Sequence, residues 1–341
     1  MTTPAPHHAV LALIVPVAAA LICAGLIMVL RPWLQRYALA RPNARSSHVT
    51  PTPQGGGIAV MLATAIAVAL AGLLGLPASA HAVAIVMAAS LCLAAVGMID
   101  DLKPIPVLPR LALQLAAVVL VFAALPSDLR ILEPVPIALE RTLLILGMLW
   151  FINLVNFMDG LDWMTVAEML PVTITLAALA LFGEAPSEVL GIALALAGAL
   201  LGFAPFNRPV AKLFLGDVGS LPIGLITGWC LIELASRQHI AAALLLPLYY
   251  LADATITLFR RLARREPFWI AHRSHYYQRA TDHGFGVRQV VTEVFLLNLL
   301  LAALAIASIV TRSTAVDIVL VALGALGVMA VLVRFSRPRA G

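Results

Sequence analysis

Stretches of eighteen or more predominantly apolar residues recur along the whole length of this 341-residue chain. A helix needs about 20 apolar residues to cross the hydrocarbon core of a bilayer. The chain is 62% hydrophobic and only 11% charged, with a mean hydropathy of +1.00. Too little polar surface therefore remains to cover a soluble fold. The sequence predicts an all-α polytopic integral membrane protein and excludes a soluble enzyme.

Hydropathy predicts about eleven transmembrane helices. Eighteen of the 22 Lys and Arg residues fall in one alternating set of connections. The positive-inside rule assigns that set to the cytoplasm, so we expect the N-terminus outside and the C-terminus in the cytoplasm. The expected spans are 9–30, 56–76, 80–99, 107–125, 137–156, 163–182, 187–205, 214–235, 239–259, 290–311 and 315–333. They form one transmembrane domain over 1–341, with cytoplasmic connections at about 31–55, 100–106, 157–162, 206–213 and 260–289.

The cytoplasmic connections also carry every chemically suggestive stretch of the sequence. The net charge of +5 is explained by these connections, so we expect membrane lipid and no nucleic acid as a partner. The stretches are RPNARSSHVTPTPQGGG, GMIDDLKP, NLVNFMDGLD, NRPVAKLFLGDVGS and AHRSHYYQR. Since they share one side, we expect a single site at the inner membrane face, reached by a water-soluble substrate.

Four polar residues spaced three apart lie at the end of the predicted fifth span and just beyond it: Asn153, Asn156, Asp159 and Asp162. Residues three apart are neighbours on a helix, and Gly160 can bend the chain so that the two carboxylates converge. Two close carboxylates repel unless a cation lies between them, and oxygen ligands suit Mg²⁺ or Mn²⁺. An interfacial turn rich in Asn, Asp and Gly is the alternative.

Three further aspartates lie at the predicted cytoplasmic ends of helices. Asp100 and Asp101 end the third span beside Lys103, and a solvated helix end is the alternative for this pair. Asp217 stands between Gly216 and Gly219, where small residues allow close approach of a ligand. A helix N-cap is the alternative for Asp217.

The long connection supplies donors suited to a diphosphate, namely His272, Arg273 and His275. Asp253 lies within a predicted span, where carboxylates usually have a function. Zinc is disfavoured because the three cysteines are scattered in apolar runs.

Five ordered stretches, PNARSSHVTPTPQGGG, GMIDD, NLVNFMDGLD, FLGDVGS and HRSHYYQR, resemble the bacterial polyprenyl-phosphate N-acetylhexosamine-1-phosphate transferases, the family of WecA, WbpL and MraY. They span about residues 42–279. The resemblance implies transfer of a sugar 1-phosphate from a UDP-N-acetylhexosamine to undecaprenyl phosphate, with release of UMP. It also implies Mg²⁺ or Mn²⁺ at the cytoplasmic face of the bacterial inner membrane, and leaves a homodimer open.

The resemblance also implies roles for individual residues. Asp217 matches the metal ligand, and the acidic catalytic set is Asp100, Asp101, Asp159 and Asp162. His272, Arg273 and His275 match the substrate contacts, with Asn153 and Asn156 in support. Their positions in the sequence add Lys103 and Asp253 to the predicted substrate-binding set.

The form HRSHYYQR is similar to the O-antigen branch, with the peptidoglycan enzymes as the alternative branch. Trp163 follows DGLD where the family usually has Gly, and this bulky side chain would narrow the pocket beside Asp162 and affect which sugar fits. A secondary transporter is the rival class, but transporter sites lie near the bilayer midplane.

Overall fold

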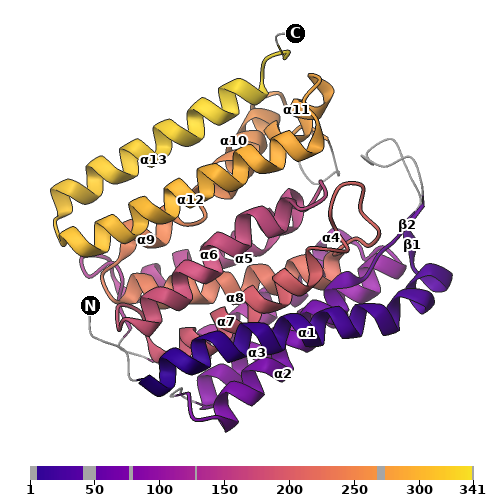
Figure 1. Cartoon of the computed structure of the whole chain (residues 1–341). Helices are drawn as coiled ribbons and strands as arrows, with labels where there is room; N and C mark the ends of the chain where they lie inside the picture. The colour runs from indigo at the N-terminus through magenta and orange to yellow at the C-terminus, as the bar shows by residue number, and fades with distance from the viewer. Residues whose placement is uncertain (1–5, 41–50, 77–79, 127–128, 267–272, 340–341) are drawn as a thin grey trace.

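The computed structural model describes residues 6–40, 51–76, 80–126, 129–266 and 273–339. Helices form most of this part of the chain, and most of them run side by side in one bundle (Figure 1). Two short strands, β1 (Leu39–Ala40) and β2 (Thr52–Pro53), pair antiparallel. The helices are α1 (Pro6–Tyr37), α2 (Gly56–Leu73), α3 (Ala80–Leu102), α4 (Val107–Ala124), α5 (Ile137–Met158), α6 (Met164–Leu181), α7 (Ser187–Phe203), α8 (Asp217–Ser236), α9 (Ile240–Leu245), α10 (Leu248–Ala263), α11 (Tyr276–Asp282), α12 (Val287–Thr311) and α13 (Thr314–Phe335).

The prediction of an all-α multi-pass membrane protein is confirmed. Among the described residues, nine helices are long and apolar enough to cross a membrane, and α7 is a shorter apolar helix. Apolar side chains cover much of their outer surface; Leu73, for example, is 86% exposed and Leu13 is 72% exposed. Such an exterior is stable in lipid rather than in water.

One predicted span is wrong as a continuous helix. The segment 239–259 is broken into α9 and α10, with Pro247 as the residue before α10. Proline has no backbone N–H to continue a helical ladder, so a helix break at this position is expected. The predicted cytoplasmic connection 260–289 is partly helical, since α10 extends to Ala263, α11 lies within the connection, and α12 starts at Val287.

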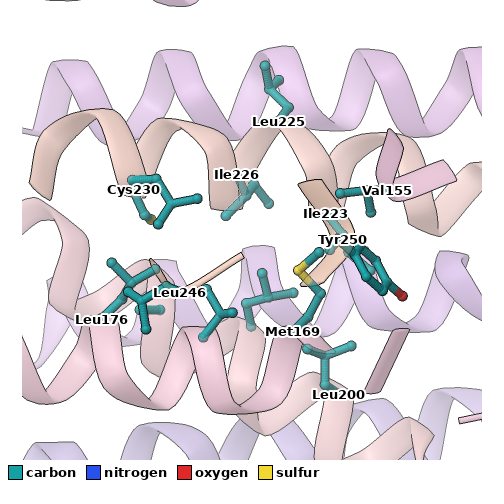
Figure 2. Close-up of a cluster of buried hydrophobic side chains, with 14 of the residues drawn as sticks. Val155, Met169, Leu176, Leu200, Ile223, Leu225, Ile226, Cys230, Leu246 and Tyr250 are labelled. Atoms are coloured by element: carbon teal, nitrogen blue, oxygen red, sulfur yellow. The ribbon is translucent and has the colours of Figure 1, made fainter. Parts of the chain in front are cut away.

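Helix α8 lies at the centre of the bundle. Almost all of its span is buried, between α2, α3, α5 and α6. Figure 2 shows part of the apolar core around it, where Ile223 and Ile226 of α8 face Met169 and Leu176 of α6. Because α8 is buried on all sides, the position of its first residue, Asp217, is fixed by the core.

The first turn of α8 packs closely against α2. The backbone N–H groups of Gly56 and Gly57 donate to the carbonyls of Phe214 and Leu215, both at 2.8 Å. A side chain at Gly57 would place its Cβ 2.3 Å from the Cα of Gly219, so this contact requires glycine. We expected small residues here to admit a ligand. Instead Gly219 admits the backbone of α2.

Candidate active site

Asp101 caps the N-terminus of α8. Its Oδ1 accepts from the backbone N–H of Asp217 at 2.9 Å, and its Oδ2 accepts from that of Val218 at 3.2 Å. The side-chain amide of Gln54 also donates to Asp101. The first N–H groups of a helix have no partner within the helix, so a carboxylate here satisfies them. Asp101 therefore links α3, the Gln54 segment and α8, and sets the position of Asp217.

Asp100 and Asp217 both lie beside the guanidinium group of Arg110. The Arg110 guanidinium lies 2.7 Å from Asp100 Oδ2 and 3.6 Å from Asp217 Oδ2. The two carboxyl groups are also within hydrogen-bonding reach of each other. The backbone N–H of Ile105 donates to the other oxygen of Asp100. Asp217 is the more accessible partner, with its side chain 25% exposed against 8% for Asp100.

The two predicted amides at the end of α5 have different positions. The side-chain amide of Asn156 donates to Asp217 Oδ1 at 2.7 Å and to the Ser220 hydroxyl at 2.9 Å. Asn156 therefore belongs to the Asp100–Arg110–Asp217 group. Asn153 is buried one turn earlier and donates to Gln114 Oε1 at 2.6 Å. Its contact is with α4, away from the aspartates.

Asp159 and Asp162 lie near enough to interact electrostatically, but they contact different partners. The Thr165 hydroxyl donates to Asp159, and the backbone N–H of Ala211 donates to Asp162 at 2.9 Å. Burial raises the pKa of the Asp159 carboxyl to about 7, against the opposing hydrogen bond from Thr165. Asp162 is buried and anchors the connection that leads to α8. The two carboxylates thus have separate hydrogen-bond partners, and Asp159 also interacts electrostatically with Asp101 of the site.

Trp163 anchors the same connection. Its backbone N–H donates to the Asn207 side chain at 2.8 Å, and its indole N–H donates to the Ala204 carbonyl at 2.6 Å. Its backbone has a positive φ of 65° immediately before α6. The structure thus accounts for this tryptophan through packing of the 204–211 connection. Its predicted effect on the choice of sugar stays a prediction.

Gly160 admits the α11 segment to this turn. A Cβ at Gly160 would lie 2.1 Å from the hydroxyl oxygen of Tyr277. That hydroxyl donates to the Phe157 carbonyl at 3.0 Å, and Tyr277 is fully buried. Because Gly160 has no side chain, α11 can pack against the end of α5. This role is additional to any bend that the glycine allows in the chain.

Asp253 caps α11 in the way that Asp101 caps α8. Its carboxylate accepts from the backbone N–H groups of Tyr276 and Tyr277, at 2.9 and 3.1 Å. The hydroxyls of Tyr249 and Thr257 lie at 3.2 and 3.3 Å, and His275 Nδ1 at 3.4 Å. Asp253 is fully buried. This carboxylate positions the HYYQ segment and has no accessible surface to offer a substrate.

The remaining predicted contacts are spread around this corner. His275 is buried and stacks on Tyr277, with ring centroids 5.8 Å apart. Arg273 donates to the Thr281 hydroxyl at 2.9 Å and pairs with Asp282 at 3.2 Å. Lys103 is exposed just beyond α3. His272 lies outside the described residues.

Sequence reasoning missed Arg110 as a site residue. Arg110 entered the sequence analysis only as one of the Lys and Arg residues expected in the cytoplasm. A single arginine at the start of a helix has no distinguishing pattern. The available signal was its position in the first turn of the helix that follows Asp100 and Asp101. Gln54 was within a noted stretch, PTPQGGG, but only the fold brings it to Asp101.

The donor set at Asp217 is compatible with a divalent cation. Mg²⁺ is usually bound through one or two carboxylates, with water and substrate phosphate as the other ligands. Asp217 and Asp100 supply two carboxylates, and Arg110 offsets one of their two negative charges. No group of three or more acidic, His or Cys side chains with metal-binding geometry occurs within the described ranges. The site therefore suits a cation shared with a phosphate ligand rather than one held by protein alone.

Apolar spanning helices with carboxylates gathered at one end define a multi-pass membrane protein with an acidic site at the end of the bundle. Residues 83–235 match the model of glycosyl transferase family 4. The chain belongs to this family, whose members include the polyprenyl-phosphate N-acetylhexosamine-1-phosphate transferases. The resemblance found in the sequence motifs is thereby confirmed.

Curated relatives cover most of the chain. It is 30% identical to the decaprenyl-phosphate N-acetylglucosaminephosphotransferase of Mycobacterium leprae, over 80% of this chain and 76% of the relative. It is 25% identical to a probable undecaprenyl-phosphate N-acetylglucosaminyl 1-phosphate transferase of Bacillus subtilis, over 85% and 83%. It is 26% identical to a phospho-N-acetylmuramoyl-pentapeptide-transferase of Ruegeria pomeroyi, over 67% and 72%.

Proposed function

We propose that this protein transfers an N-acetylhexosamine 1-phosphate from a UDP-sugar to undecaprenyl phosphate and releases UMP. The observation that carries the proposal is the Asp100–Arg110–Asp217 group at the end of apolar helices. Two carboxylates and a guanidinium at the end of membrane-spanning helices support a site that a lipid phosphate and a nucleotide diphosphate can both reach. The names of the relatives, which act on polyprenyl phosphate, support the same reaction.

The chemistry requires two negatively charged substrates to meet. An oxygen of the acceptor phosphate forms a bond to the sugar-bound phosphorus of the donor, and the bond from that phosphorus to the UMP oxygen breaks. The acceptor needs little help from a base, because a phosphate monoester has a second pKa of about 6. Arg110 is the cation nearest to the aspartates, and it can donate to a phosphate oxygen while remaining beside Asp100.

In this proposal Asp217 and Asp100 hold Mg²⁺ or Mn²⁺. When bound, the ion stabilises the negative charge that develops during phosphoryl transfer. Asn156 keeps Asp217 oriented, through the hydrogen bond to its Oδ1. Asp101 fixes the start of α8 and therefore the place of Asp217 itself.

The surroundings of Asp100 suit a lipid acceptor. Ile99 and Leu102, beside the two aspartates of α3, are 53% and 57% exposed. A cavity of about 150 Å³ lined by Trp33, Met98 and Asp101 lies at the same end of the helix. An isoprenoid chain in the bilayer could thus bring its phosphate to Asp100 without leaving the apolar phase.

The proposal includes the location and the pathway. Lys and Arg distribution supports a site on the cytoplasmic face of the inner membrane. The form of the HRSHYYQR stretch supports the first step of O-antigen or other cell-envelope polysaccharide synthesis. The relatives named as N-acetylglucosamine phosphotransferases favour N-acetylglucosamine among possible sugars.

The direct test is an assay of purified protein with undecaprenyl phosphate and a panel of UDP-N-acetylhexosamines. We expect UMP and lipid-linked sugar in equal amounts, with activity lost in EDTA and restored by Mg²⁺. Release of UMP without lipid product, or no turnover with any donor, contradicts the proposal. Exchange of labelled UMP into UDP-sugar without acceptor would replace direct attack with a covalent enzyme intermediate.

A further inference from the structure

A polar cavity lies at the end of the bundle opposite the aspartates. Helices α6, α8 and α12 run toward it from the aspartate end, and the 20 residues of α8 cover about 30 Å. The cavity has a volume of about 460 Å³ and opens between the connections that follow these three helices. Its charged and polar lining includes Glu184, Arg237, His239, Ser308, Arg312 and Asp317. It is therefore separate from the proposed active site.

Part of the charge in this cavity is balanced within the protein. Glu184 Oε2 lies 3.4 Å from His239 Nε2, and Glu184 Oε1 lies 3.5 Å from a guanidinium nitrogen of Arg312. Glu184 is buried, whereas the Arg312 side chain is 71% exposed. These three residues form a wall of the cavity.

Arg237 and Asp317 are opposite charges that line the same cavity without pairing with each other. Arg237 interacts electrostatically with Glu233, and Asp317 with His239. No ion pair joins either of them to a partner in the part of the chain that the structure describes. The Oδ1 atom of Asp317 is buried and has no hydrogen-bond partner there. Asp317 lies in the first turn of α13, where the helix dipole favours a negative charge. The dipole does not, however, supply a hydrogen-bond donor to Oδ1. A buried acceptor without a partner is costly, so a ligand that donates to it would bind favourably.

The cavity also borders the lipid-facing surface. Val310 and Ile318, each one residue from a lining residue, are 61% and 66% exposed. A ligand with acyl chains could therefore place its polar group in the cavity and its chains along α12 and α13. Such a ligand must carry a negative group for Arg237 and an N–H donor for Asp317.

We propose that this cavity binds the phosphoethanolamine headgroup of a membrane phospholipid, with the phosphate on Arg237 and the ammonium on Asp317. An ammonium carries N–H donors, whereas the trimethylammonium of a choline headgroup has none. A glycerol headgroup supplies hydroxyl donors but no positive charge. The chemistry of the cavity thus selects ethanolamine among common headgroups.

Titration of the full-length protein in detergent with lipids of matched acyl chains, followed by native mass spectrometry, tests this proposal. We expect one saturable phosphatidylethanolamine site, with binding about tenfold weaker for phosphatidylcholine, as for the loss of one charge-assisted hydrogen bond. Asp317→Asn should remove this preference, whereas Arg237→Gln should weaken the binding of both lipids, because both carry the phosphate. Neither variant should change transferase turnover in detergent. His81→Gln, at an exposed position, is the control and should bind as the parent does.

Soluble phosphoethanolamine distinguishes the two sources of this headgroup. Competition with the lipid at millimolar concentration would show that the headgroup alone is recognised, and binding of the lipid only would show that the acyl chains contribute. Either result supports the site. Equal binding of the ethanolamine and choline lipids, an unchanged preference in Asp317→Asn, or unchanged binding of both lipids in Arg237→Gln would overturn it. Thermal unfolding of each variant confirms that the fold is intact.

Discussion

The α10–α11 corner and the start of α8 both depend on buried or half-buried carboxylates, but the two regions use them differently. At the corner, Asp253 accepts from two backbone N–H groups and is fully buried. At the start of α8, Asp217 accepts from the Asn156 side chain, and its other oxygen faces Arg110. A carboxylate bonded to backbone is fixed by the fold, whereas one bonded to side chains can exchange partners with a ligand. On the proposed function, this difference separates Asp253 as a structural aspartate from Asp217 as a reactive one.

Replacement of Asp217 by Asn should have the largest effect on catalysis. The amide keeps the size of the side chain and can still accept from Asn156, but it loses the charge that a cation requires. We expect the transfer rate to fall by about 10²–10³, as for other losses of transition-state stabilisation. UMP release measures the rate, and thermal unfolding should change little. A variant that turns over normally would remove Asp217 from the reaction.

Replacement of Asp253 by Ala should act through stability. It leaves the N–H groups of Tyr276 and Tyr277 buried without an acceptor, at a cost of about 1–3 kcal/mol each. We expect a clearly lower melting temperature, with most of the activity retained below it once the protein is folded. Asp253→Asn, which keeps one acceptor oxygen, should recover part of the stability. A large loss of activity at unchanged stability would instead assign Asp253 to the substrate.

A methyl group at Gly160 tests the contact between the two regions. Its Cβ would overlap the hydroxyl of Tyr277, which is buried and bonded to the Phe157 carbonyl. We expect Gly160→Ala to destabilise the fold by about 1–3 kcal/mol, as for other overpacked sites. Adding Tyr277→Phe removes the overlapping oxygen and should restore part of this loss in thermal unfolding. No recovery in the double variant would mean that the overlap is not the cause.

The pH dependence of stability should show a smaller effect from Asp159. Its folded pKa of about 7 lies above the ordinary value of about 3.9. The folded state therefore holds the proton more tightly, and the stability this contributes is fully present below about pH 3.9. It is lost as pH rises through about 7.

Between pH 6 and pH 8 the free energy of unfolding should fall by about 1 kcal/mol from this group. Asp159→Asn carries no titrating proton and should reduce the slope by that amount. Thermal unfolding in metal-free buffer measures the difference. Equal slopes for the parent and the variant would mean that Asp159 does not titrate in this range.

Much of the fold could be predicted from the sequence, because apolar runs long enough to span a bilayer have few other solutions. The break at Pro247 shows the limit of hydropathy, since both halves of the segment are apolar. The site could be predicted in part. Asp217 and Asn156 do meet, but the roles of Asp101 and Asp253 as caps could not be read from sequence. Those roles depend on which helix start packs beside each carboxylate, which only the tertiary structure decides.

Manganese binding tests the central claim, that Asp217 is reactive and Asp253 is structural. Electron paramagnetic resonance titration of Mn²⁺ in the presence of UDP-N-acetylglucosamine should give one bound ion per chain in the parent and in Asp253→Asn. The same titration of Asp217→Asn should give none at concentrations that saturate the parent. Equal binding in the parent and Asp217→Asn, or loss only in folded Asp253→Asn, would contradict this assignment of the two aspartates.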